Sequence, residues 1–343
     1  MKRGLDMKRF SYLFLLIASM IIVMPKLADA NEMNFSVKAI LPENQRDQTH
    51  TYFDLNVVPG TTQVIEVELK NETDNDVTVQ TVANTAVTND NGIVEYTNEK
   101  PKLDKSLAIP FSKIASVQSD ITIPKQSSLQ LPVTLKIPEK SFDVVILGGL
   151  YFKEKETDQE TKKSKDDVQI ENKFSYTIGV LLAESPETVL PDLVLNDVKA
   201  TQKVGRNVVT ANLQNPKAAL LSNLTVDAKV YEAESNQLLH EEKQTSLRMA
   251  PNSNFNYSVS WGNEAFKTGD YRIEITATDG NQNWHLKKDF KIKGEEAKKY
   301  NDSAVHIAQK STPWTYWLMG GIIIVLLIVI AFLILKNKKK KSN

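Results

Sequence analysis

The chain has 343 residues, with 42 Lys and Arg balanced by 42 Asp and Glu, and it contains no cysteine. The lack of cysteine excludes disulfides, thiol catalysis and thiolate metal sites. Zero net charge gives no overall basic character of the kind that draws a protein to nucleic acid.

The first thirty residues have the pattern of a secretory signal peptide. Four basic residues precede an apolar run over 12–24, and Ala28-Asp29-Ala30 has the A-x-A form of a cleavage site. An uncleaved signal anchor is the alternative. We therefore set residues 1–30 apart from the fold and expect the exported part to begin at residue 31.

The exported part is acidic. Setting aside ten basic and two acidic residues at the two ends leaves 32 basic and 40 acidic residues, a net charge of −8. This charge argues against nucleic acid and against a polybasic lipid-binding surface. An exported chain without disulfides fits a Gram-positive surface better than an animal ectodomain.

Residues 31–185 alternate apolar and polar side chains with a period of two. Ile65, Val67 and Leu69 would share one face of a strand, while Glu66 and Glu68 would share the other. Turn-forming residues separate several such segments, with no amphipathic helix between them. The pattern predicts a first β-sandwich.

Two features interrupt this pattern. Gly148 and Gly149 lie inside the apolar strand 144–151, which predicts a bulge or a close backbone approach, serving either packing or a ligand. Residues 153–167 are rich in charges of both signs. We expect a solvated hairpin extension there, and a partner-binding loop is the alternative.

A second sandwich is predicted over 187–294. Pro186 and Pro191 mark the boundary, and the period of two then resumes, for example at Val226, Ala228 and Val230. Residues 295–313 read as a polar spacer.

Residues 314–335 contain no charge and are followed by five lysines in the tail 336–343. The 18 apolar residues 318–335 would rise about 27 Å as a helix, which suits a membrane core. Aromatic residues before them and lysines after them predict an N-out, C-in orientation. A buried core helix is the alternative. The predicted fold class is all-β, with two tandem immunoglobulin-like β-sandwich domains followed by a single C-terminal transmembrane helix. The predicted location is the cell membrane, single-pass, with the ectodomain in the wall.

Catalytic chemistry is sparse in this sequence. The four histidines are expected in loops and a linker, without ligand spacing, and no nucleophile motif occurs. We expect no cofactor, no metal and no enzymatic activity. Ligand-binding candidates lie in the polar stretch 41–52, with an ordinary exposed loop as the alternative; they are Asn44, Gln45, Arg46 and Tyr52.

Several stretches resemble a known family. FSVKAILPENQ (35–45), YFDLNVVPG (52–60) and VVILGGLYF (144–152) resemble the first domain of the WxL-interacting proteins of Gram-positive bacteria. PDLVLNDVKA (191–200) and MAPNSNFNYSVSW (249–261) resemble the second domain of that family. One departure is Asp143-Val144, where the family pattern leads us to expect a glycine.

The resemblance implies a non-catalytic surface protein. Its first domain would bind peptidoglycan, its second would bind host proteins, and the chain would act alongside WxL-domain surface proteins. Two other readings are a cell-wall enzyme, which would need an organised pair of carboxylates or a nucleophile, and a sensor subunit that works through a membrane partner. A tail of eight residues, 336–343, is too short for a signalling domain.

Overall fold

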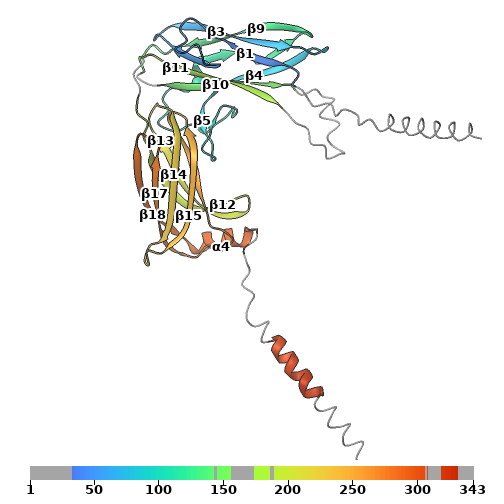
Figure 1. Ribbon diagram of the computed structural model, residues 1–343, viewed down its shortest axis with the longest axis vertical. Coiled ribbons are helices and arrows are strands. Elements are labelled where there is room, and N and C mark those ends of the chain that lie inside the picture. Colours follow the sequence, from blue (N-terminus) through green and yellow to red (C-terminus); the bar gives the residue numbers. More distant parts are fainter. Residues whose placement is uncertain are drawn as a thin grey trace, which may run out of the picture. The chain divides into compact units, whose positions relative to one another are not determined.

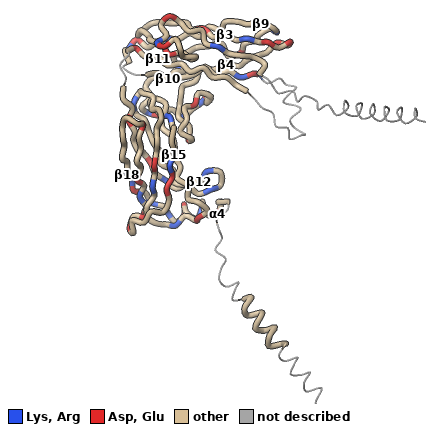
Figure 2. The backbone as a smooth tube through the Cα atoms, in the orientation of Figure 1, with Lys and Arg blue, Asp and Glu red and all other residues tan. Residues whose placement is uncertain are grey.

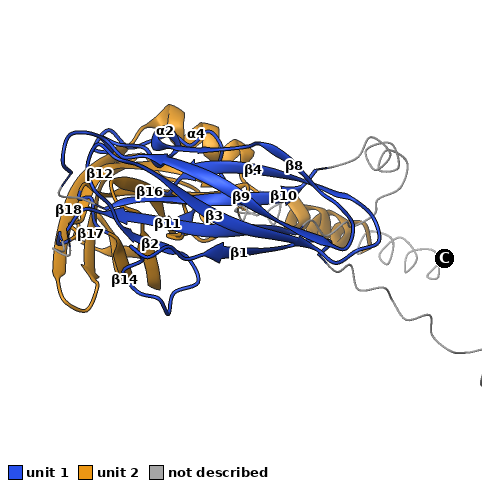
Figure 3. Cartoon of the chain, turned by 90° about the horizontal axis from the view of Figure 1, so that it is seen from above, with its two compact units in different colours: residues 1–87, 94–190, 217–219 blue, residues 88–93, 191–216, 220–343 orange. Residues whose placement is uncertain are grey.

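The structure is a computed structural model that describes residues 33–142, 145–155, 174–185, 189–305, 307 and 318–330. The chain divides into two compact units (Figures 1 and 3). Unit 1 holds the residues up to 87 with 94–190 and 217–219, and unit 2 holds 88–93, 191–216 and the residues from 220 onward. The predicted signal peptide, residues 143–144 and most of 153–167 lie outside the described residues.

Unit 1 contains two main sheets. In spatial order, the first consists of β1 (Ser36–Ile40), β3 (Thr62–Asn71), β9 (Ser127–Lys136) and β7 (Ala115–Val117). The second consists of β2 (Phe53–Asn56), β11 (Ser175–Ala183), β10 (Ile146–Glu154), β4 (Val77–Thr85) and β8 (Asp120–Ile123). All these pairs are antiparallel except β2 with β11, which is parallel. A short two-stranded sheet joins β5 (Val87–Thr88) to β6 (Val94–Glu95).

Alternation along the strands builds the core of unit 1. Ile65, Val67 and Leu69 are at most 1% exposed, and the glutamates between them are only half-buried. The buried faces of both sheets contribute to one apolar cluster, which includes Phe53 and Phe152. Charged residues of both signs are distributed along the strands and loops (Figure 2).

Both glycines of the pair in β10 are packed closely against aromatic side chains. The register of β10 with β11 and with β4 runs through both glycines without a shift, so there is no bulge. Helix α2 (Phe111–Ile114) places Phe111 against Gly148 on the core side, and a Cβ there would lie 2.0 Å from the Phe111 ring. A Cβ on Gly149 would lie 2.8 Å from the ring of Tyr96. Of the two sequence expectations, close approach is the one observed.

Unit 2 also contains two sheets. The smaller consists of β12 (Val194–Lys203), β13 (Arg206–Asn215) and β16 (Ser253–Ser260). The larger consists of β15 (Leu238–Met249), β14 (Leu221–Glu232), β17 (Gly269–Thr278) and β18 (Asn283–Ile292). Trp261, for which a core role and a sugar-stacking role are both conceivable, is 3% exposed and belongs to the core cluster.

The first part of the predicted spacer is helical. Helix α4 (Gly294–Ser303) buries Ala297 in the core of unit 2, and the ring of Tyr300 lies 6.2 Å from that of Phe266. These contacts make α4 a part of unit 2.

The prediction of a C-terminal transmembrane helix is wrong. Among the residues that the structure describes, no helix combines the length and the apolar character needed to cross a membrane. The described helical segment there covers residues 318–330. The described part of that segment accounts for about 20 Å of helix, against a hydrocarbon core of about 30 Å. The all-β part of the predicted fold agrees with the structure.

Candidate functional site

The segment 41–52, which contains the four predicted binding residues, leads from β1 to β2. Within it, residues 44–46 run antiparallel to β2 along the edge that β11 does not occupy. The Asn56 N–H donates to the Asn44 carbonyl at 3.0 Å, and the Arg46 N–H donates to the Asp54 carbonyl at 2.7 Å. Gln45 forms a β-bridge with Leu55 between them. The segment therefore closes an edge that would otherwise present unpaired backbone groups.

Asn44 uses its side chain to hold this arrangement. Its amide nitrogen donates to the Asn56 carbonyl at 2.7 Å. Asn44 and Gln63, a residue of β3, also exchange two amide hydrogen bonds of 3.0 and 2.8 Å. The Asn44 amide thus ties the segment to the other sheet of unit 1.

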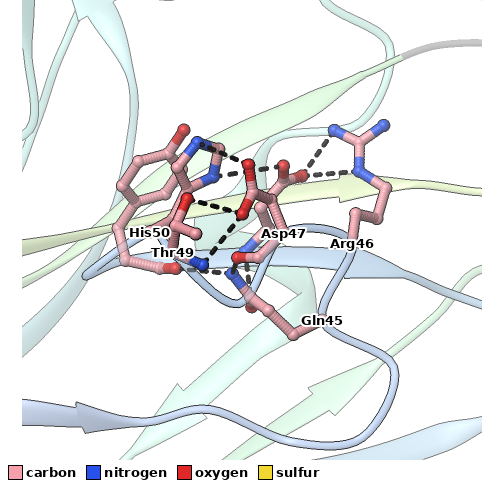
Figure 4. A network of polar contacts seen from close by, with 7 residues as sticks. Gln45, Arg46, Asp47, Thr49 and His50 are labelled. Carbon is pink, nitrogen blue, oxygen red and sulfur yellow. Dashed lines mark hydrogen bonds and ion pairs between the residues drawn. The ribbon is translucent and has the colours of Figure 1, made fainter.

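Gln45 is 7% exposed and forms the centre of a polar network (Figure 4). Its amide nitrogen donates to the carbonyls of Asp47 and Tyr52, each at 3.0 Å. Its amide oxygen accepts the Asp54 N–H at 3.0 Å. A buried amide with these three bonds is expensive to replace, because alanine would leave backbone groups without partners.

Arg46 forms an ion pair with Asp54. The Arg46 Nε donates to Asp54 Oδ1 at 2.6 Å, and the two side chains are 31% and 10% exposed. A charge-assisted hydrogen bond to a nearly buried carboxylate is stronger than an exposed ion pair. This pairing neutralises Asp54, so the segment carries little unbalanced charge at this point.

Asp47, Thr49 and His50 complete the network (Figure 4). The Thr49 hydroxyl and N–H donate to Asp47 Oδ1 at 2.6 and 2.8 Å, and these bonds hold the pKa of the Asp47 carboxyl below its usual value. The His50 Nε2 and Nδ1 lie 3.6 Å from carboxylate oxygens of Asp47 and Asp54, respectively. The His50 ring stacks on that of Tyr52, with centroids 4.5 Å apart and planes at 16°. His50 therefore fixes the ring of Tyr52, which is 36% exposed.

The structure brings the four predicted residues together but gives them different surroundings. The amides of Asn44 and Gln45 and the guanidinium of Arg46 bond within the chain, whereas Tyr52 presents ring surface to solvent. Their role in ligand binding stays a prediction. Sequence reasoning missed His50 and its two carboxylates, because the residues fall together only when the segment folds back on β2.

The described residues contain no group of three or more His, Cys, Asp or Glu arranged to hold a metal ion. His240 and His285, expected in loops, lie in β15 and β18. The pKa of His240 is lowered because burial disfavours its charged form.

Two family models match the chain. Residues 35–154 match a model described as the peptidoglycan binding domain of the WxL Interacting Protein, and residues 165–302 match its host binding domain. No curated protein matches the chain.

Among solved structures, similarity extends to fimbrial chaperones. A chaperone–tip adhesin complex of CFA/I fimbriae biogenesis is 12% identical over 76% of this chain and 98% of that chain, with a TM-score of 0.30. The class 5 fimbriae chaperone CfaA is 12% identical over 74% and 99%, with a TM-score of 0.28. The CsuC–CsuE complex of Acinetobacter baumannii is 10% identical over 66% and 90%, with a TM-score of 0.31. Scores this low give the likeness no weight for function.

The boundary between the two family matches differs from that between the two units. Strand β11 (Ser175–Ala183) falls in the host binding match, yet it pairs with β10 and β2 in unit 1. A fragment that ended at residue 154 would leave β2 without its sheet. Unit 1 therefore requires residues well beyond the match to the peptidoglycan binding domain.

Proposed function

The chain belongs to the WxL Interacting Protein family, and we propose that it is a non-catalytic cell-surface protein that binds peptidoglycan through unit 1 and host proteins through unit 2. It would do so in association with WxL-domain surface proteins. The observation that carries the proposal is the pair of family matches, which together cover most of the chain in the order peptidoglycan binding, then host binding.

The arrangement of unit 1 supports a polymer ligand. The match to the peptidoglycan binding domain spans β1 to β10, which contribute to both main sheets. Sheets of this kind offer extended faces, and a glycan strand needs an extended surface more than a deep pocket. Tyr52, among the predicted binding residues, would contribute its ring, while Asn44, Gln45 and Arg46 would position the segment that carries it.

Sedimentation with purified cell-wall sacculi tests the peptidoglycan part of the proposal. The full chain is required, because unit 1 includes residues 217–219 and unit 2 includes residues 88–93, so neither unit is one continuous stretch. We expect the folded chain to sediment with sacculi and the heat-denatured chain to stay in solution. Equal recovery of both would contradict specific binding. Release of soluble muropeptides above that of the denatured control would contradict the non-catalytic role.

A second experiment tests the partners. Immobilised WxL-domain proteins and a panel of purified extracellular-matrix proteins would be probed with the full chain. We expect binding to at least one member of each group, and binding to neither would limit the proposal to the cell wall.

A further inference from the structure

The central rows of one outward sheet face of unit 1 carry no charged side chain, although the ion pairs Lys153–Glu99 and Lys155–Asp120 lie at one end of the sheet. This face belongs to the sheet β2-β11-β10-β4-β8, on the side opposite the core. The register places two rows of outward residues side by side across β4, β10 and β11. The rows contain Val82, Tyr151 and Thr177, and Asn84, Gly149 and Gly179. Thr177 is exposed, Val82, Tyr151 and Gly179 are half-buried, and Asn84 and Gly149 are buried, so the accessible part of these rows centres on β11. Uncharged accessible positions grouped in this way suggest a binding surface.

Gly179 lies at the centre of this face, and packing does not require glycine there. Its φ is outside the left-handed region, and the nearest atom to an added Cβ would be the Tyr52 Cβ at 3.9 Å, an ordinary contact. Glycine in a strand interior lowers stability, because it brings no side chain and loses more backbone freedom on folding. The missing side chain therefore costs stability without serving the fold, and it leaves a half-buried strip of backbone open at Gly179.

Two tyrosines flank this strip. Tyr96 lies over Gly149, with its Cβ, Cγ and Cδ1 atoms all within 2.9 Å of the position that a Cβ would occupy. Tyr52 lies next to Gly179 and is held there by the stacked ring of His50. Tyr151 is the neighbour of Gly149 on the same side of β10 and is half-buried, with the Lys153 ammonium 5.9 Å from its ring centroid.

We propose that this surface, defined by Tyr52, Tyr96, Gly149, Tyr151 and Gly179 and called the glycine–tyrosine face, binds the glycan strand of peptidoglycan. N-acetylated sugars present apolar C–H faces that pack on aromatic rings, and the phenol oxygens can hydrogen-bond to their hydroxyl and amide groups. The open strip at Gly179 lets the polymer approach the backbone there. The inference rests on the proposed peptidoglycan binding and names the surface and the part of the polymer that it recognises.

A substitution that fills the strip tests the proposal. In the full chain, Gly179→Phe places a ring where the glycan would lie, and the free space around the Cβ position allows the strand to form. The matched control is Thr134→Phe, which adds the same ring at an outward position of β9 on the other sheet. We expect sacculus binding to weaken about tenfold or more for Gly179→Phe. The control should stay within about twofold of the parent, with both variants folded by circular dichroism.

Tyr52→Ala provides a second variant in case Gly179→Phe does not fold, and it should weaken binding about threefold or more. Soluble N-acetylglucosamine oligomers should compete with sacculi for the parent chain, whereas the free stem peptides should not. Unchanged sacculus binding in folded Gly179→Phe, or competition by stem peptides alone, would overturn this inference while leaving peptidoglycan binding intact. A parent chain that fails to bind sacculi would instead overturn the proposed function.

Discussion

The two outward faces of unit 1 cover the same core but have different chemistry. On the sheet β1-β3-β9-β7, the outward register pairs Lys38 with Glu68, and Lys70 and Glu66 lie on neighbouring outward positions. On the other sheet, the corresponding central positions hold glycine, tyrosine, threonine, asparagine and valine. The core imposes the same alternation on both sheets, so it cannot explain the difference. The charged face has the composition expected of ordinary solvated surface, and the glycine–tyrosine face calls for a functional reason.

The largest expected effect distinguishes Gly148, which packs against a buried ring, from Gly179, which has open space beside it. Gly148→Ala would place a Cβ 2.0 Å from the buried ring of Phe111. Overpacking of this kind should lower the free energy of unfolding by about 3 kcal/mol. Gly179→Ala, the matched control, should leave it unchanged or raise it by up to about 1 kcal/mol. Urea denaturation measures both, and a large loss for Gly179→Ala would mean that this glycine serves packing after all.

An intermediate effect is expected at Gly149. Alanine there would approach the Tyr96 ring at 2.8 Å, and this half-buried side chain can move aside. We expect a loss of about 1–2 kcal/mol in stability together with weaker sacculus binding, because Tyr96 leaves its place on the face. Binding at the parent level in a variant destabilised to this extent would remove Tyr96 from the proposed surface.

A substitution on the charged face of the sheet β1-β3-β9-β7 tests whether that face contributes to binding. Glu68→Gln removes the charged cross-strand neighbour of Lys38, an exposed residue paired with a half-buried one. Stability should change by no more than about 0.5 kcal/mol, because screening weakens such pairs. Sacculus binding should be unaffected, and a clear loss of binding would move the wall contact to this sheet.

The smallest expected effect concerns salt. A face without net charge should bind sacculi with less than about a twofold change between roughly 50 and 150 mM NaCl, because little of the interaction is screened. Sedimentation across this range measures it. A steep fall in binding would indicate that charged groups, and not the tyrosines, carry the contact.

The sequence predicted the strands of unit 1 well where one face is buried. Leu131, Val133 and Leu135 alternate with the outward residues Pro132 and Thr134 because β9 lies between two strands and covers the core. Strand β15 was not predicted from the sequence. It is an edge strand in which Leu247 and Met249 are the buried apolar residues, so it has little alternation to detect.

The candidate site was harder to predict for a topological reason. The stretch 41–52 is recognisably polar, and Tyr52 follows from that observation. Gly179, however, lies more than a hundred residues away, and its position beside Tyr52 depends on the parallel pairing of β2 with β11. No local pattern in the sequence encodes that pairing.

The position of β11 has a consequence for how unit 1 acquires its structure. This strand comes last in the sequence of the unit but lies between β2 and β10 in the sheet. Phe53 of β2 pairs with Val180 of β11, which follows it by 127 residues, so during synthesis β2 cannot pair with β11 until that stretch has emerged. Pairing at such a distance raises the contact order and slows folding, because a long loop must close before the contact forms. Until then the nascent chain keeps an incomplete sheet with exposed apolar faces, so this is the stage at which aggregation competes with folding.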